Sequence, residues 1–257
     1  RLFNTKFAKK YFMNRWTKTK IVATLGPASN TREMLSAMMD AGMDVARINS
    51  SHGSYEFHQQ TINIIRELNH AKKSNVAILV DLQGPKLRIG NVENNEVILV
   101  DGKDITITTE ECIGTASKIY ITYPEFPKDV AVGDSVKIDD GKLELRVTNT
   151  NRKDTVQAVV VNGGVLSSKK GVNLPNTKIS LPSLTKKDIE DLNFALSNNV
   201  EWIGLSFVRS VTDVIDLKER IKAAKKTTRV IAKIEKPEAI EEIDNIIDMA
   251  DGVMVAR

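Results

Sequence analysis

The stretch VARINSSHGSYEFHQQTINIIRELNHAKKSNVAILVDL, residues 45–82, contains a strand, a helix and a second strand. Its two ends, residues 45–49 and 76–82, are short apolar runs of the kind that form buried strands. Between them, the apolar residues Ile62, Ile64, Ile65 and Leu68 form a helix face, which predicts a helix over residues 55–71. Buried apolar strands that are separated by a helix favour a parallel sheet.

The alternation of strands and helices continues on both sides of this unit. Before it, we expect a strand over residues 20–25 and a helix over residues 31–41. In the last third of the chain we expect helices and strands to alternate over residues 186–197, 202–206, 211–225, 229–234, 238–249 and 252–255. Six parallel strands with intervening helices predict an α/β fold, a (β/α)8 TIM-type barrel that is incomplete, with about six strands present. A doubly wound sheet is the alternative.

A region without long helical patterns interrupts this alternation between about residues 89 and 184. Turn signals such as Asp101-Gly102 and Asp140-Gly141 separate short alternating runs there. We expect strands over residues 97–100, 105–108, 118–122, 135–138, 143–148 and 155–161. The region therefore predicts a small all-β barrel domain that is inserted into the α/β fold.

The expected domain boundaries follow from this change of pattern. They are 1–18 for a basic N-terminal extension, 19–88 for the first part of the barrel domain, 89–183 for the inserted β domain and 184–257 for the second part of the barrel domain. Without the extension and the insertion about 144 residues remain, whereas an eight-unit barrel usually contains about 250. Because the chain also stops at Arg257, directly after an expected strand, we expect it to end inside the barrel.

The charge distribution limits the classes of partner. The formal net charge is +4, but the first 20 residues contain seven basic and no acidic side chains, which leaves 30 basic and 33 acidic side chains in the remainder. A basic globular surface for nucleic acid is therefore not expected. The basic extension is compatible with a targeting peptide or a membrane-surface helix, but a solvated tail is favoured.

Hydrophobicity and cysteine content point to an intracellular protein without a membrane span. No run of 18 apolar residues is present, so no membrane-spanning helix is expected. Cys112 is the single cysteine, which excludes an intrachain disulfide and fits a reducing, cytoplasmic compartment.

Polar and charged side chains follow the expected strands, and barrel enzymes form their active sites at these strand ends. In chain order they are Arg47, Asn49, Ser51, His52, Asp81, Lys86, Arg88, Ser206, Phe207, Arg209, Lys233, Glu235 and Arg257. The set is mainly cationic with a few carboxylates. This chemistry suits an anionic, phosphorylated substrate and a divalent metal that is bound by a carboxylate.

Each of these residues also has a structural interpretation. An arginine at a strand end often forms a surface ion pair, and an aspartate such as Asp81 often caps a turn. Lys233 differs because it lies within the apolar run VIAKIE, and a lysine is seldom buried without a partner. Glu235 points to the same side of the strand as Lys233. The two residues are therefore either a structural ion pair or a lysine beside a metal-bound carboxylate.

Seven stretches of the sequence, in this order, resemble the pyruvate kinase family. They are TKIVATLGPAS (19–29), DVARINSSHG (44–53), DLQGPKLRIG (81–90), SKKGVNLP (168–175), LSFVRS (205–210), IAKIEKPEA (231–239) and DGVMVAR (251–257). The β domain also lies where that family has it, between the third and fourth barrel strands. The resemblance implies that this domain is a mobile lid.

The resemblance further implies an activity and its partners. Members of the family transfer a phosphoryl group from phosphoenolpyruvate to ADP, which gives pyruvate and ATP in the last step of glycolysis. The implied cofactor is Mg²⁺ or Mn²⁺, and the implied full-length protein is a cytoplasmic homotetramer that binds neither nucleic acid nor a membrane.

Residue roles also follow from the resemblance. Arg47 would bind the substrate phosphate, and Lys233 would bind substrate and stabilise charge on the transferring phosphoryl group and the enolate oxygen. Glu235 would be one of two carboxylate ligands of the magnesium ion; the second follows the Ala-Arg pair of the sixth strand in the family, beyond Arg257. Nucleotide-phosphate contacts are implied for His52, Arg88 and Lys170. Monovalent-cation positions are implied for Asn49, Ser51 and Asp81.

Two departures from the family pattern modify these expectations. Ser50 stands where many members have phenylalanine, which removes an apolar anchor. Lys86 and Leu82 stand where potassium-dependent members have glutamate and threonine. Because a fixed ammonium group can replace the charge of a bound cation, we expect that potassium is not required.

Two other functional interpretations remain at this stage. A barrel lyase or aldolase that acts on pyruvate or phosphoenolpyruvate could also use Glu235 to bind magnesium. The β insertion and Lys170 argue against it, because that chemistry needs no nucleotide lid. Since one metal ligand and at least two barrel strands are expected to be missing, residues 1–257 alone are expected to have negligible activity.

Overall fold

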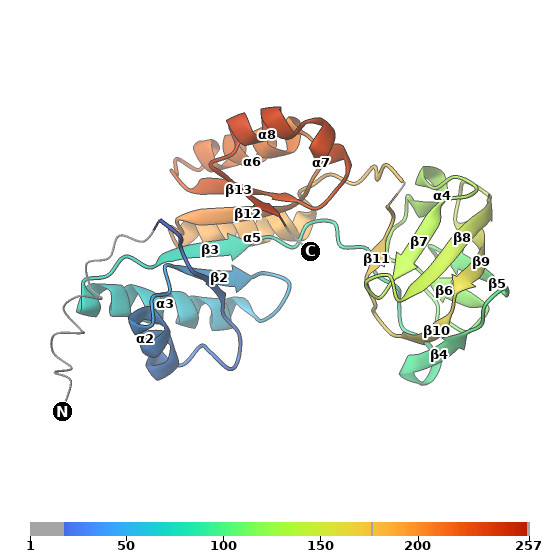
Figure 1. Ribbon diagram of the computed structural model, residues 1–257, viewed down its shortest axis with the longest axis horizontal. Coiled ribbons are helices and arrows are strands. Elements are labelled where there is room, and N and C mark those ends of the chain that lie inside the picture. The colour runs from blue at the N-terminus through green and yellow to red at the C-terminus, as the bar shows by residue number, and fades with distance from the viewer. Residues whose placement is uncertain (1–17, 176, 256–257) are drawn as a thin grey trace, which may run out of the picture.

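The structure is a computed structural model that describes residues 18–175 and 177–255 (Figure 1). Residues 1–17 of the basic extension, and Arg257, lie outside the described residues.

A six-stranded parallel sheet forms the first part of the molecule. Its order is β1 (Val22–Thr24), β2 (Val45–Asn49), β3 (Ala77–Asp81), β12 (Trp202–Val208), β13 (Arg229–Ile234) and β14 (Gly252–Val255). Each neighbouring pair is parallel, and the strand order follows the chain without reversal. A doubly wound sheet requires such a reversal, so that alternative is wrong. The predicted incomplete (β/α)8 arrangement is confirmed.

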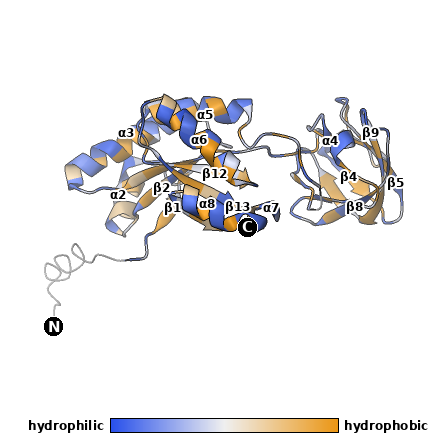
Figure 2. Ribbon diagram, turned by 90° about the horizontal axis from the view of Figure 1, so that it is seen from above, coloured by the Kyte–Doolittle hydropathy of each residue, from blue (hydrophilic) through white to orange (hydrophobic). Residues whose placement is uncertain are grey.

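Helices connect these strands and cover the sheet. They are α2 (Arg32–Asp40), α3 (Tyr55–Lys72), α5 (Lys186–Ser197), α6 (Val211–Ala223), α7 (Glu238–Glu241) and α8 (Ile243–Met249). In Figure 1, α2 and α3 lie below the strands and α6 to α8 lie above them. The helical stripe Ile62, Ile65 and Leu68 is buried against strand residues such as Ile78, as its spacing predicts. Figure 2 shows the same segregation, with hydrophobic strands beneath helices whose outer faces are hydrophilic.

The single helix expected over residues 238–249 is interrupted at Glu242. This residue leaves the helical region, at φ −113° and ψ 21°, and separates α7 from α8. Its carboxylate accepts a hydrogen bond of 3.0 Å from the backbone nitrogen of Val211, at the start of α6. The contact with α6 therefore outweighs the local helical preference of the sequence.

The inserted part of the chain is built from β strands. One sheet has the order β11 (Val172–Asn173), β7 (Ser135–Ile138), β8 (Leu143–Thr150), β9 (Thr155–Asn162), β5 (Asp104–Thr108) and β6 (Lys118–Tyr120). A second sheet pairs β4 (Glu96–Leu99) with β10 (Gly164–Ser167). The short helices η1 (Glu93–Asn95) and α4 (Phe126–Asp129) complete it. The insertion has a hydrophobic cluster of its own, distinct from that of the parallel sheet.

Two strands of the insertion, β10 and β11, are absent from the sequence prediction. The pair Gly163-Gly164 indicates a turn, yet β10 begins at Gly164. A side chain on Gly163 would lie 2.3 Å from the carbonyl oxygen of Leu99. Glycine is therefore required there for the close approach of the two backbone segments. The strand β11 has two residues and is too short for an alternation pattern to indicate it.

A buried tyrosine makes the stability of the β domain sensitive to alkaline pH. Tyr123 is fully buried and hydrogen-bonds Asp129, and burial followed by this contact raises its pKa to about 12. The unfolded chain, with a tyrosine pKa of about 10, releases the proton first, so stability that is complete below pH 10 is lost as the pH rises towards 12. We expect about 1 kcal/mol of unfolding free energy to be lost through Tyr123 between pH 10 and pH 11.

Urea unfolding of the unsubstituted chain and of Tyr123→Phe at both pH values measures this loss. The substitution removes the titrating group. Between pH 10 and pH 11 the variant should therefore lose about 1 kcal/mol less unfolding free energy than the unsubstituted chain. Equal losses in the two proteins would contradict the prediction.

No helix among the described residues is both long enough and apolar enough to cross a membrane.

Candidate active site

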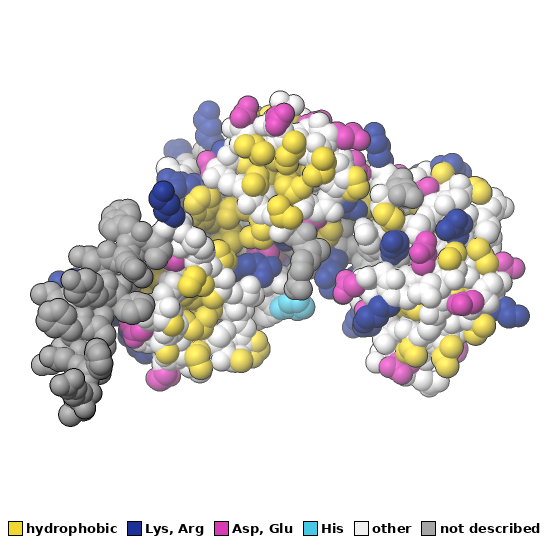
Figure 3. All heavy atoms as spheres, viewed as in Figure 1, with side chains coloured by type: hydrophobic (Ala, Val, Ile, Leu, Met, Phe, Trp, Pro, Cys, Tyr) yellow, Lys and Arg dark blue, Asp and Glu magenta, His cyan; other side chains and the backbone are white. Residues whose placement is uncertain are grey.

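A pocket of about 740 Å³ lies between the carboxyl ends of the parallel strands and the β domain. Six cationic side chains line it, Arg47, Lys86, Lys137, Arg209, Lys233 and Lys236. Three carboxylates, Asp81, Asp140 and Glu235, also line it. Figure 3 shows Lys and Arg side chains at the hollow between the two parts of the molecule. The excess of positive charge favours an anionic ligand.

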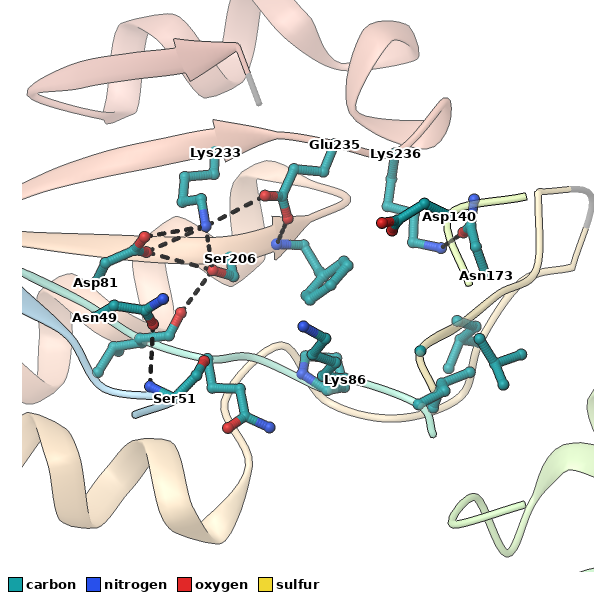
Figure 4. A pocket seen from close by; sticks show the side chains of 18 of the residues that line it. Asn49, Ser51, Asp81, Lys86, Asp140, Asn173, Ser206, Lys233, Glu235 and Lys236 are labelled. Atoms are coloured by element: carbon teal, nitrogen blue, oxygen red, sulfur yellow. Dashed lines mark hydrogen bonds and ion pairs between the residues drawn. The ribbon is translucent and has the colours of Figure 1, made fainter. Parts of the chain in front are cut away.

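Lys233 is the centre of a hydrogen-bond network at the base of this pocket (Figure 4). It is 9% exposed, and its Nζ lies 2.7 Å from Ser206 Oγ, 3.2 Å from Asp81 Oδ1 and 3.2 Å from Glu235 Oε1. Glu235 follows the last residue of β13, and its carboxylate lies on the same side as Lys233, as the spacing of two predicts. The lysine therefore has the partners that a buried ammonium group needs, and these partners lie in a pocket.

Asp81 joins Lys233 to Arg47. Its side chain is 2% exposed, and its Oδ2 accepts hydrogen bonds from Nε of Arg47, at 2.9 Å, and from Nη2 of the same residue. The guanidinium group is also held by Thr24 Oγ1 at 2.7 Å. Arg47 comes from β2, beside Asp81 on β3, whereas Lys233 comes from β13, two strands further along the sheet. The ends of three strands therefore bring both cations to one carboxylate.

Glu235 is fixed from a second direction by the end of β12, where the pairing with β13 shifts register between Leu205 and Val208. Its Oε2 accepts a hydrogen bond of 3.0 Å from the backbone nitrogen of Phe207. Phe207 has a φ of 55°, a conformation that is uncommon for a bulky residue. A side chain on Gly84 would lie 2.7 Å from the Phe207 ring, so glycine is required opposite this irregular end of β12.

The residues implied as monovalent-cation positions also line the pocket. The side chain of Asn49 accepts a hydrogen bond of 3.0 Å from the backbone nitrogen of Ser51. Lys86 lines the same pocket, and Leu82 is buried beside it, with 1% exposure. The structure thus brings Lys86 to the pocket in which the sequence predicts that it replaces a cation.

The three residues implied as nucleotide contacts do not line this pocket. His52 is exposed, and Nη1 of Arg88 donates a hydrogen bond of 2.9 Å to the carbonyl of Lys169. Nζ of Lys170 lies 2.9 Å from Asp139 Oδ1, and this bond, followed by that of Lys142, lowers the pKa of Asp139. In this conformation these residues contact the β domain or the solvent rather than Lys233 and its neighbours.

The sequence did not indicate that Lys236 and the β domain contribute to the pocket. Lys236 follows Glu235 directly, is 9% exposed and has a pKa that burial lowers. Lys137, Asp140 and Asn173 line the pocket from the β domain. The available signal for Lys236 was its place one residue after Glu235, but spacing gives no indication that the β domain covers it.

The carboxylates of the pocket fit a metal ion that takes most of its ligands from water and from a bound substrate. Among residues 18–175 and 177–255, no group of three or more His, Cys, Asp or Glu side chains is arranged to hold a metal ion. Asp81 already neutralises two cations and Asp140 belongs to the β domain, which leaves Glu235 as the available carboxylate at the strand ends beside Lys233. Mg²⁺ is commonly held by one or two carboxylates together with water and substrate phosphate. Glu235 fits that requirement.

The fold and the pocket together define an α/β barrel-type protein with a β insertion and a cationic pocket at its strand ends. A family model described as "Pyruvate kinase, barrel domain" matches residues 16–257. The chain is 41% identical over 241 residues to a pyruvate kinase of Staphylococcus epidermidis and 43% identical over 242 residues to one of Geobacillus stearothermophilus; each alignment covers 93% of this chain and 41% of the relative. It is 42% identical over 240 residues to a pyruvate kinase of Thermococcus litoralis, an alignment that covers 93% of this chain and 50% of the relative.

The chain belongs to the pyruvate kinase family, as the seven stretches predicted. It spans between 41% and 50% of the length of these relatives. Membership supports the prediction of an enzyme, a transferase, and it implies dependence on a metal.

Proposed function

We propose that the pocket of this chain is the site at which a phosphoryl group passes from phosphoenolpyruvate to ADP to give pyruvate and ATP. The observation that supports this most strongly is the convergence of Lys233, Glu235 and Arg47 on one pocket with excess positive charge. Phosphoryl transfer depends mainly on positioning and on neutralisation of charge, and these side chains provide both. Family membership favours this function over a lyase or an aldolase.

Each side chain has a distinct role in the proposed reaction. Arg47, oriented by Asp81 and Thr24, binds the phosphate of phosphoenolpyruvate. Lys233 donates to the phosphoryl oxygens and to the enolate oxygen that develops as the phosphoryl group leaves. Glu235 would hold Mg²⁺ or Mn²⁺, which supplies further positive charge to the phosphate oxygens when bound. Exclusion of water by the neighbouring β domain would strengthen each of these interactions.

The nucleotide is proposed to bind where the β domain faces the parallel strands. His52, Arg88 and Lys170 remain the proposed contacts for its phosphates. Lys170 and Arg88 would exchange their present partners, Asp139 and the carbonyl of Lys169, for phosphate oxygens. A movement of the β domain as a lid would permit that exchange.

Other attributes of the protein are proposed on family grounds. They are a cytoplasmic location, assembly of the full-length protein as a homotetramer, and the absence of nucleic-acid and membrane partners. The domain boundaries 1–18, 19–88, 89–183 and 184–257 are proposed from the change of sequence pattern.

Calorimetric titration of phosphoenolpyruvate into the chain tests the proposed function. Binding is the chosen readout because the chain spans at most half of the length of its relatives. We expect saturable binding that requires Mg²⁺ and is lost in excess chelator, and we expect ADP to bind as well. A lyase site would bind phosphoenolpyruvate without ADP. If phosphoenolpyruvate bound neither with Mg²⁺ nor in excess chelator, the proposal would be contradicted.

Potassium should have no specific effect on this binding. The exposed ammonium of Lys86 lines the pocket and provides the charge that a bound cation would otherwise contribute. We expect equal affinities for phosphoenolpyruvate in potassium and in tetramethylammonium salts of the same ionic strength. Lys86→Glu replaces the cation with a carboxylate and should weaken binding of phosphoenolpyruvate. We expect potassium to restore much of that lost affinity. A strict potassium requirement in the unsubstituted chain would refute the prediction.

A further inference from the structure

A buried ammonium group lies on the side of the pocket next to the β domain. Lys236 is 9% exposed, and its Nζ makes a long hydrogen bond of 3.5 Å to Asn173 Oδ1 on β11 (Figure 4). It also lies 5.9 Å from the centre of the Phe207 ring. Within the described part of the chain, no carboxylate forms a salt bridge with it. The charge of Lys236 is therefore removed from water without a direct counter-charge.

The other cationic side chains of the pocket differ from Lys236 in this respect. Three of them have a carboxylate partner, namely Arg47, Lys233 and Arg209. The remaining two, Lys86 and Lys137, are not buried, so water can solvate their ammonium groups. Among the cationic side chains of the described residues that line the pocket, Lys236 alone combines burial with the absence of an ion pair.

More distant charges compensate Lys236 only in part. Glu238 and Glu235 attract its ammonium group, whereas Arg209 repels it. The amide oxygen of Asn173 is neutral, and 3.5 Å is long for a hydrogen bond. An uncompensated buried charge is costly, and in a functional pocket an anionic group of a ligand can supply the missing counter-charge.

We propose that Lys236 is a phosphate-binding residue, whose ammonium group leaves Asn173 and donates to a phosphate oxygen of the ligand. The proposal rests on the proposed function and deepens it, because it assigns a role to a residue outside the predicted set. Lysine suits this role as a compact charge on a flexible stem that can turn from the β domain to the ligand. The phosphate group is that of phosphoenolpyruvate or of ADP, and the test separates the two.

Calorimetric titration of the full chain with phosphoenolpyruvate and, separately, with ADP tests the proposal in the presence of Mg²⁺. Lys236→Met removes the charge and keeps the length of the side chain. We expect it to weaken binding of one of the two ligands about tenfold, and that ligand is the source of the phosphate. Lys236→Arg should restore most of the affinity. Lys103→Met, an exposed lysine outside the pocket, should bind both ligands as the unsubstituted chain does.

Stability without ligand separates this role from a purely structural one. If Lys236 has no counter-charge without a ligand, its burial costs free energy. Lys236→Met should then unfold at the same or a higher urea concentration than the unsubstituted chain. If Lys236 instead serves to hold the β domain through Asn173, the variant should unfold at a lower concentration, and Asn173→Ala should weaken ligand binding as much as Lys236→Met does.

The failure of this proposal is distinguishable from the failure of the proposed function. If the unsubstituted chain binds phosphoenolpyruvate and ADP while Lys236→Met binds both equally well, this proposal alone is overturned. The proposal is also overturned if Lys236→Met unfolds at a lower urea concentration than the unsubstituted chain and Asn173→Ala weakens ligand binding as much as Lys236→Met does. If the unsubstituted chain binds neither ligand, both proposals are overturned.

Discussion

Lys233→Met is expected to weaken binding of phosphoenolpyruvate, in the presence of Mg²⁺, by about 100-fold, or about 2.7 kcal/mol. The ammonium of Lys233 lies between Asp81 and Glu235, at 3.2 Å from each carboxylate. Its removal takes away a cation that would contact the phosphate and exposes the ligand to two carboxylates that are less well neutralised. Both effects act in the same direction on an anionic ligand.

Calorimetric titration of the unsubstituted chain and of Lys233→Met measures this effect. Lys103→Met is the matched control, because it removes the same charge from an exposed position outside the pocket. Asp81 retains Arg47 in the variant, so the chain should still fold, and circular dichroism checks that it does. If a folded Lys233→Met bound phosphoenolpyruvate within about threefold of the unsubstituted chain, the pair of Lys233 and Glu235 would be structural only.

Asp81→Asn is expected to lower the free energy of unfolding by about 3 kcal/mol. The substitution keeps the shape of the side chain and removes the charge that neutralises both Arg47 and Lys233. Asp81 is 2% exposed, so water cannot replace the lost interactions. The two cations would then repel each other, with Glu235 as the remaining carboxylate at Lys233. Urea unfolding at neutral pH measures the difference.

Asp139→Asn provides the matched control for this measurement. Asp139 also holds two cations, Lys142 and Lys170, but it does so near the surface of the β domain. Exposed ion pairs contribute little because water and salt screen them, so the control should lose much less stability than Asp81→Asn. Comparable losses in the two variants would show that burial of Asp81 does not determine its contribution.

Local sequence patterns predicted most of the parallel sheet because its strands are apolar runs with clear ends. Residues 45–49, 229–234 and 252–255 were predicted as strands with the bounds that the structure has. The parallel geometry then brings the carboxyl ends of neighbouring strands together, which is why Arg47, Asp81 and Lys233 meet although they are far apart in the chain.

Features that depend on contacts between distant segments could not be predicted in this way. The break at Glu242 depends on a hydrogen bond to Val211, and the burial of Lys236 depends on Asn173 of the β domain. The ion pair between Lys170 and Asp139 depends on the turn after β7, which carries Asp139. Spacing along the chain carries no information on these contacts, because each is set by the way in which two separately folded segments pack.

The most direct test of the central claim is a crystal structure of the chain with Mn²⁺ and phosphoenolpyruvate, in which anomalous scattering locates the metal. We predict a manganese peak at the carboxylate of Glu235, with the phosphate of the ligand in contact with Lys233 and Arg47. A ligand bound elsewhere, or a manganese peak remote from Glu235, would contradict the assignment of this pocket as the site of phosphoryl transfer.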